Sequence, residues 1–255
     1  MVGKKLKLTL LGSVAAALCL VGATASSQAQ EFTFKDKAEF EQAVKDVILA
    51  DPQVLFDAIE LHRANETRDQ QAKAAEKIEE YKEHFSRKEA PSVGAEDADI
   101  TIVEFFDYNC GYCKRALPDI QAVVDEDDKV RVVFNEMAIL GPTSQTAALW
   151  SLAAHKQGKY FEYHVALMEH KGPKTEEELM KLGESIGLDA EQLKKDAASE
   201  EVKAEFDKDM TVAQDVGVQG TPAFIVGTQF VPGYVPKNAL MDIIKEERAK
   251  LANEG

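Results

Sequence analysis

The sequence predicts an α/β protein with a helical segment ahead of its sheet-forming part. Two runs of β-branched and aromatic residues, 100–106 and 130–134, are typical of buried strands, and a helical pattern lies between them. Residues 53–88 contain neither Gly nor Pro and are rich in strong helix formers. Residues 143–216 are again helical in pattern and are followed by two short apolar runs. Strands that alternate with helices, after a purely helical segment, predict the α/β class.

Residues 1–29 have the composition of a secretory signal peptide. Three lysines and no acid stand in residues 1–7, and residues 8–22 are apolar. Small residues at 23–25 or 27–29 offer a cleavage site. A membrane anchor is the alternative, but the apolar run is shorter than the ~20 residues that a bilayer requires. We therefore expect export to the periplasm and cleavage of the signal.

The exported chain would be strongly acidic and would carry two cysteines. Removal of residues 1–29 leaves 27 basic and 45 acidic residues, a formal charge of −18. This balance argues against nucleic acids and anionic membrane surfaces as partners. Cys19 leaves with the signal, so Cys110 and Cys113 remain, in a compartment where disulfides persist. A zinc site needs four ligands and no histidine is close in sequence, so no metal site is expected.

Residues 30–90 are expected to form a helical N-terminal segment. A short helix is followed by a restart at Asp51-Pro52, with Asp as the cap and Pro in the first turn. The second helix would extend to about residue 88 and reach ~50 Å, longer than a small domain is wide. Its apolar stripe is narrow, which leaves two interpretations: a stalk that self-associates through residues 34–88, or a solvated linker. The stripe consists of Ala72, Ala75, Ile78, Tyr81 and Phe85.

Residues 91–255 are expected to form the second domain, after a boundary at Ala90-Pro-Ser-Val-Gly94. In this domain Cys110-Gly-Tyr-Cys113 stands where the first strand ends and a helix begins. Unpaired N–H groups and the helix dipole at such a position favour a thiolate. Two cysteines one helical turn apart can close a small disulfide. The pair is therefore predicted to be redox-active.

The rest of the chain predicts a helical insert, two strands and a final helix. The insert, about 143–216, is broken near Gly158, Gly172 and Gly187. The strands are expected at 223–226 and 229–231, and the last helix at 238–251. Trp150 in the insert is predicted to be a core residue. Three histidines of the insert are predicted to lie at the surface: His155, His164 and His170.

The order of these elements, with the residues that occupy them, resembles the thioredoxin fold with the helical insertion of the DsbA family. The resemblance covers about residues 100–251. Cys110-Gly-Tyr-Cys113 takes the place of the family's redox pair. The resemblance implies that Cys110 is the attacking thiolate and that Cys113 is the resolving thiol.

Gly220-Thr221-Pro222 takes the place of the cis-proline loop of this family. The resemblance implies that Thr221 offers its backbone to an extended substrate and that Pro222 is cis. From the residues alone a trans bond would be expected, because only about 5–6% of X-Pro bonds in folded proteins are cis. Tyr112, between the cysteines, is interpreted as a substrate contact, with simple exposure as the alternative.

Glu104 matches the buried acid of the family that is thought to help move protons for the cysteines. Ile102 and Phe106 share its face of the strand, and Val103 and Phe105 occupy the other face. Since both faces are apolar, we expect a buried carboxyl group rather than an outward-facing one. Burial would raise its pKa.

The N-terminal segment adds a second resemblance. Residues 40–88, with the break at Ala50-Asp-Pro-Gln-Val54, resemble the leading segment of ScsC-type relatives of DsbA, which oligomerises in some of them. The resemblance implies a homo-oligomer in which tethered redox domains raise the effective concentration. Gly-Tyr between the cysteines and Thr before the proline resemble DsbC-like isomerases. Dedicated oxidases more often carry Pro-His and Val there.

The sequence therefore predicts an exported thiol–disulfide oxidoreductase that acts on cysteine-containing exported proteins, as an isomerase or reductase. No dissociable cofactor is expected, and a membrane thiol–disulfide relay protein would reset the pair. A dithiol oxidase that introduces disulfides is the nearest alternative. An alternative of another class is a periplasmic protein that captures Cu(I) with the two thiolates. A third is a redox-inactive thioredoxin scaffold.

Overall fold

The computed structural model describes residues 34–254, which divide into two compact units, one up to Asn65 and one from Glu66. The first unit holds α1 (Lys37–Ala50) and the beginning of α2 (Gln53–Glu80). The predicted signal peptide lies outside the described residues. No helix among the residues described is long and apolar enough to span a bilayer.

The first two helices begin where their capping residues predict. The Asp36 carboxylate accepts a hydrogen bond from the Glu39 N–H at 3.0 Å and starts α1. Asp51 does the same for Gln53 at 3.2 Å, just before α2. The single helix predicted to residue 88 is interrupted at Tyr81, and α3 (Lys82–Ser86) follows. The Tyr81 ring is buried and its hydroxyl is bonded to Asp215, which ties the chain down at this break.

The second unit contains a five-stranded mixed sheet in the order β1-β3-β2-β4-β5. β2 (Ile100–Phe106) and β3 (Val130–Glu136) are parallel, as the predicted β-α-β unit requires, and every other pairing is antiparallel. β4 (Ala223–Val226) and β5 (Gln229–Pro232) complete one edge. β1 (Ser92–Gly94) forms the other edge and was missed, because three residues are too few to show a strand period.

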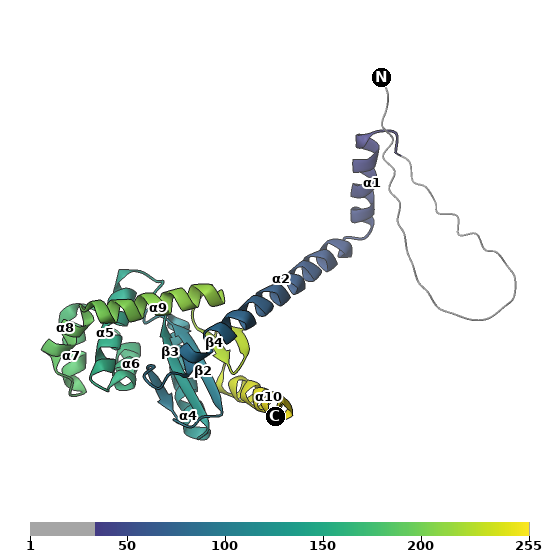
Figure 1. Cartoon of the computed structure of the whole chain (residues 1–255). Helices are drawn as coiled ribbons and strands as arrows, with labels where there is room; N and C mark the ends of the chain where they lie inside the picture. The colour runs from purple at the N-terminus through teal and green to yellow at the C-terminus, as the bar shows by residue number, and fades with distance from the viewer. Residues whose placement is uncertain (1–33, 255) are drawn as a thin grey trace. The chain divides into compact units, whose positions relative to one another are not determined.

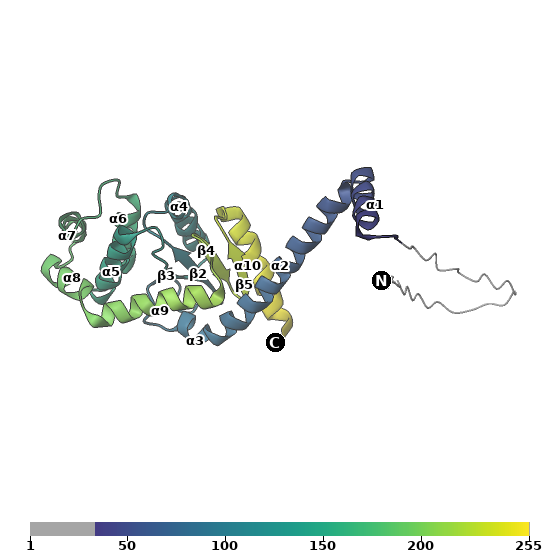
Figure 2. The same cartoon turned by 90° about the horizontal axis from the view of Figure 1, so that it is seen from above.

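Helices cover both faces of this sheet (Figures 1 and 2). α4 (Gly111–Glu126) and α10 (Lys237–Glu254) lie against one face, and α3 and α9 (Glu200–Val216) lie against the other. β2 is consequently buried on both sides, as its sequence predicted. One side carries Ile102 and Phe106, and the other carries Val103 and Phe105.

The C-terminal part of α2 belongs to the second unit. Ala74 and Ile78 enter the core formed by Val103 and Phe105, together with Phe85 of α3. The rings of Phe85 and Phe105 meet edge to face at a centroid distance of 6.4 Å. The sheet-bearing unit therefore covers the C-terminal part of the predicted stripe, from Ile78 to Phe85. Ala72 and Ala75 of the predicted stripe are exposed, and Ala74 is buried in their place.

The helical insert follows β3, close to its predicted limits. It consists of α5 (Pro142–Lys156), α6 (Tyr160–Glu169), α7 (Glu176–Ser185), α8 (Ala190–Ala197) and α9. Gly158 and Gly187 separate helices because both have positive φ, 73° and 77°, which favours glycine. Trp150 is buried, so its predicted place in the core is confirmed.

The prediction of a surface position is wrong for His164. This residue is 1% exposed, and its ring lies 4.8 Å from the Phe106 ring and 4.6 Å from the Phe134 ring. Its Nδ1 is 3.1 Å from the Tyr108 hydroxyl, which supplies the partner that a buried imidazole needs. His155 and His170 are half-buried at the surface.

Candidate redox site

Cys110 is the residue from which α4 starts. It has extended φ and ψ values of −76° and 120° and no side-chain capping bond, so its sulfur is not used to hold the helix end. The prediction that a helix begins at this cysteine is confirmed. Both cysteines are free thiols, Cys110 8% exposed and Cys113 1% exposed. The more accessible sulfur is therefore the one at the helix N-terminus.

The Thr221–Pro222 peptide bond is cis, as the resemblance predicted. The Cys110 thiol donates a hydrogen bond to the Thr221 carbonyl oxygen at 3.2 Å. β4 begins directly after this loop and pairs with β2, which leads to the redox turn. The pairing of these two strands thus brings together residues that are more than 100 positions apart.

Glu104 is buried, 2% exposed, in the middle of β2. Phe134 and Phe224 are its neighbours in register on the two adjoining strands. Burial raises the pKa of Glu104 to about 8. Burial also raises the pKa of Cys113 strongly, and the negative charge of Glu104 adds to this effect. The structure therefore places the acid and the buried thiol within electrostatic reach of each other.

Asp107 holds the redox turn in place. Its Oδ1 accepts hydrogen bonds from the Asn109 N–H and the Ser144 hydroxyl, both at 2.7 Å. Its Oδ2 accepts from the N–H groups of Ile139 and Leu140, both at 2.9 Å. One buried carboxylate thus joins the turn to the start of the helical insert.

Comparison with known proteins assigns this arrangement to a family. Residues 101–245 match the DSBA-like thioredoxin domain over more than half of the chain. The chain belongs to the DsbA-like thioredoxin domain family. Residues 36–74 separately match the N-terminal domain of the copper resistance protein ScsC.

Curated relatives of this DsbA-like chain are of two kinds. Disulfide bond formation protein D of Bacillus subtilis is 29% identical over 175 residues, which are 64% of this chain and 78% of that protein. The Na(+)/H(+) antiporter NhaA 3 of Salinispora tropica is 29% identical over 135 residues, 52% of this chain. The match spans only 21% of that antiporter.

Solved structures are similar over most of the DsbA-like chain. A thioredoxin-like oxidoreductase from Silicibacter pomeroyi is 43% identical, with a TM-score of 0.62, and covers 65% of this chain and 95% of its own. Proteus mirabilis ScsC in a transitional conformation is 25% identical, with a TM-score of 0.63. That match covers 84% of this chain and 97% of the ScsC chain, so it includes N-terminal helices.

Asn109, directly before Cys110, fastens the DsbA-like redox turn from its other side. Its amide nitrogen donates to the Thr143 and Ser144 hydroxyls at 2.9 and 2.8 Å. Its amide oxygen accepts from Lys174 Nζ at 2.9 Å, and burial lowers the pKa of this lysine. Asn109 is not the N-cap of α4, since Cys110 holds that position.

Tyr112 is 61% exposed and lies beside the redox pair. Its ring is 6.3 Å from the Tyr234 ring, over which the Arg115 guanidinium sits at 4.7 Å. The Tyr234 hydroxyl donates to Asp119 Oδ2 at 2.7 Å, which fixes this ring. The two aromatic rings therefore form an accessible surface next to Cys110 that a polypeptide can contact.

A buried acid that sequence reasoning missed lies at the end of β3. The Tyr160 hydroxyl donates to Glu136 Oε1 at 2.8 Å, and the Ser151 hydroxyl donates to the same atom. Burial raises the pKa of Glu136 well above its usual range, although these bonds oppose the shift. Ser151 and Tyr160 come from the insert and Tyr108, a further partner at 3.5 Å, comes from the redox turn, so no local pattern marks Glu136. The holding role of Asp107 is likewise not visible in the sequence, because three of its four partners lie more than 30 residues away.

Proposed function

We propose that this chain is an exported thiol–disulfide oxidoreductase that works in the periplasm on the disulfides of exported proteins, as an isomerase or reductase. One observation carries the proposal. The Cys110 sulfur lies at a helix N-terminus and 3.2 Å from the Thr221 carbonyl oxygen, in front of the cis Pro222. This places a reactive sulfur beside a backbone edge to which an extended substrate can bind.

In the proposed reaction the Cys110 thiolate attacks one sulfur of a substrate disulfide. The substrate S–S bond breaks, a mixed disulfide forms with Cys110, and the other substrate sulfur leaves as a thiolate. The attacking sulfur lies at the N-terminus of α4. Attack by the Cys113 thiolate on the Cys110 sulfur then releases a reduced substrate and oxidises the pair. Attack by the freed substrate thiolate instead completes an isomerisation.

The environment of Cys113 supports isomerisation. Burial raises the pKa of its thiol, so this group is protonated while the mixed disulfide persists. It must lose a proton before it can resolve the intermediate, and the proposed acceptor is the ionised form of Glu104, which is the minor form below its pKa of about 8. A slow resolving step gives the substrate time to rearrange its own disulfides.

Thr221 and Tyr112 are the proposed substrate contacts. Within the described part of the chain no backbone hydrogen bond uses the Thr221 N–H, so this group is available to an extended segment. The exposed Tyr112 ring offers an apolar contact on the other side of Cys110. Together they would hold a polypeptide across the sulfur.

Self-association through the N-terminal helices is part of the proposal. The first unit exposes large apolar side chains on both of its helices, which is unusual for a surface that stays in water. They are Phe40, Val44, Val47, Leu49, Val54, Leu55, Phe56, Ile59 and Leu61. The match of residues 36–74 to the ScsC N-terminal domain adds support. Joined copies would present several Cys110 sulfurs to one misfolded substrate.

Capture of Cu(I) is the alternative from another class, prompted by the name of the copper resistance protein ScsC. Cys110 and Cys113 offer two soft sulfur ligands. A metal requires both as thiolates, however, and the raised pKa of Cys113 opposes this. Thiol–disulfide exchange is therefore preferred over Cu(I) capture as the proposed function.

Refolding of a scrambled protein with several disulfides tests the proposal. The full exported chain is mixed with the scrambled substrate in a glutathione buffer, and native substrate activity is followed. Recovery above the buffer rate is expected, and Cys110→Ser should abolish it. Rapid oxidation of a reduced substrate without recovery of scrambled substrate would favour the oxidase. Absence of both reactions would contradict the redox proposal. A membrane thiol–disulfide relay protein is the proposed partner that resets the pair.

A further inference from the structure

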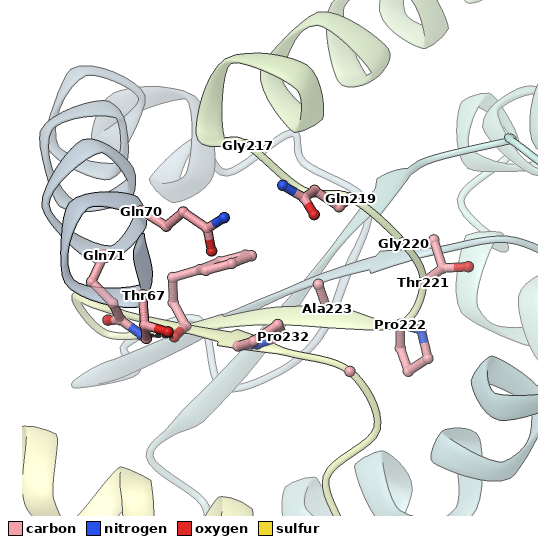
Figure 3. Close-up of a pocket in the computed structure, with 12 residues that line it drawn as sticks. Thr67, Gln70, Gln71, Gly217, Gln219, Gly220, Thr221, Pro222, Ala223 and Pro232 are labelled. Carbon is pink, nitrogen blue, oxygen red and sulfur yellow. Dashed lines mark hydrogen bonds between the residues drawn. The ribbon is translucent and has the colours of Figure 1, made fainter. Parts of the chain in front are cut away.

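A pocket of about 440 Å³ opens beside the cis-proline loop of the second unit (Figure 3). Its volume is within the ~300–1,000 Å³ of pockets that hold small ligands. One wall is formed by α2, through Thr67, Gln70 and Gln71. The opposite wall consists of the cis-proline loop and β5. This wall includes Gln219, Gly220, Thr221, Pro222, Phe230 and Pro232.

The pocket and the redox site share Thr221. Thr221 lines the pocket, and the carbonyl oxygen of the same residue accepts the hydrogen bond from the Cys110 thiol at 3.2 Å. A chain that pairs with the Thr221 backbone and presents a sulfur to Cys110 would therefore lie against a residue that lines the pocket. The occupant that the geometry favours is the substrate itself, at a residue close to its reacting cysteine.

The lining of the pocket is neutral and rich in amides. None of its lining residues is charged, in a chain with a formal charge of −15. The side chains of Gln70 and Gln219 extend toward each other from opposite walls (Figure 3). In the part of the chain that the structure describes, neither side-chain amide has a hydrogen-bond partner. Gln71 differs, because its amide donates to the Phe230 carbonyl oxygen at 3.4 Å and joins α2 to β5.

This lining discriminates between kinds of side chain. A charged group would lose hydration in the pocket without meeting an opposite charge. An apolar group would cover the amides of Gln70 and Gln219 and leave them unpaired. A neutral side chain with its own donor and acceptor, such as that of Asn or Gln, can bond to both amides, because each offers N–H and C=O groups.

We propose that this pocket is a specificity subsite for a neutral, hydrogen-bonding side chain next to the attacked cysteine of the substrate. The inference rests on the proposed function and extends it. Gln70 from α2 and Gln219 from the cis-proline loop select that side chain. α2 is accordingly a wall of the substrate site in addition to being a connection to the first unit.

Thiol exchange with paired peptides tests the subsite. Two ten-residue peptides carry one cysteine as a mixed disulfide with glutathione and differ only at the two positions flanking it, Gln in one and Leu in the other. The reduced full chain is mixed with each, and the second-order rate constants are compared. The Cys110 thiolate attacks the peptide sulfur, the peptide–glutathione bond breaks, and glutathione leaves as a thiolate. We expect the Gln peptide to react about fivefold to tenfold faster, the effect of one or two hydrogen bonds.

The variants Gln70→Leu and Gln219→Leu should each remove most of this preference. Glu76→Leu is the matched control, because it changes an exposed position of α2 outside the pocket and should keep the preference. Equal rates for the two peptides in the unaltered chain would overturn the inference, as would an unchanged preference in both pocket variants. Exchange with glutathione disulfide by the unaltered chain is measured in parallel. Its absence would show that the proposed redox function itself has failed.

Discussion

The sulfur of Cys110 lies 3.2 Å from the carbonyl oxygen of Thr221, which joins the start of α4 to the loop before β4. The two residues meet because β2 and β4 are adjacent and antiparallel. The two groups of the proposed reaction, the Thr221 backbone and the Cys110 sulfur, therefore lie side by side. Of the two cysteines that the structure describes, only Cys110 makes this contact, and Cys113 is more deeply buried. In the proposed reaction Cys110 is therefore the attacking residue and Cys113 the resolving one.

Replacement of the two cysteines should produce opposite results. Cys113→Ser removes the resolving thiol, so the mixed disulfide with a substrate protein should accumulate. Cys110→Ser removes the accessible attacking sulfur, and the buried Cys113 should form almost none of this species. Non-reducing gels and mass spectrometry of acid-quenched mixtures measure the trapped species. Equal trapping by both variants would contradict the assigned order of attack.

The stability of the reduced protein should fall with rising pH because of Glu104. Its folded pKa of about 8 lies above its usual 4.5, so the protonated form is favoured in the folded state. This stabilisation is complete below about pH 4.5 and is lost as the pH rises to about 8. Relative to Glu104→Gln, the free energy of unfolding should fall by roughly 3–4 kcal/mol between pH 5 and pH 8.

Urea denaturation of both proteins at several pH values measures this difference. Other buried acids, including Glu136, are common to both proteins and cancel in the comparison. A difference that does not change with pH would show that the Glu104 carboxyl does not titrate as the structure implies.

His164 should produce the opposite dependence on pH. Burial lowers its pKa to about 3 from 6.5, so the neutral ring is favoured in the folded state. This stabilisation is present above pH 6.5 and is lost as the pH falls. Relative to His164→Phe, the protein should lose about 2 kcal/mol between pH 7 and pH 5. Thermal or urea unfolding at these two pH values checks the sign, and a loss of the same size in both proteins would refute it.

Asp107→Asn should destabilise the protein without changing the cysteines. An amide cannot accept all four of the hydrogen bonds that the carboxylate accepts, and its NH₂ group would face other donors. We expect a loss of about 2–4 kcal/mol. Asp125→Asn, at an exposed position of α4, is the control and should lie within ~0.5 kcal/mol of the original protein. Equal stability of the two variants would rule out a holding role for Asp107.

Val47→Glu should weaken the proposed self-association. Val47 is 63% exposed on α1, and a charge at an apolar interface would lose hydration without a partner. Sedimentation of the full exported chain should show a shift toward the monomer. Lys45→Glu introduces the same residue at an exposed polar position of α1 and should leave the sedimentation mass of the assembly unchanged. A monomer for the original chain would remove this part of the proposal.

Patterns along the chain predicted the fold well where they were long or repeated. The strands around Ile102 and Val132 and the helices of the insert have clear periods. The glycine positions also predicted the breaks between helices. The cis Pro222 depended on resemblance, since local chemistry favours the trans bond.

The parts that sequence could not predict depend on contacts between distant segments. The partners of Asp107 at 139, 140 and 144 belong to another segment of the chain. His164 looks like a surface residue until Phe106 and Phe134 are placed beside it. The pocket walled by Gln70 and Gln219 joins residues about 150 positions apart, which no local period connects.

The four hydrogen bonds of Asp107 also limit how this protein could be re-engineered. A transplant of the Cys-Gly-Tyr-Cys turn alone into another thioredoxin scaffold would leave out the backbone of Ile139 and Leu140 and the hydroxyl of Ser144. The smallest transferable piece therefore contains the turn and the first residues of the helical insert. The redox turn and the segment 139–144 would therefore have to be moved together.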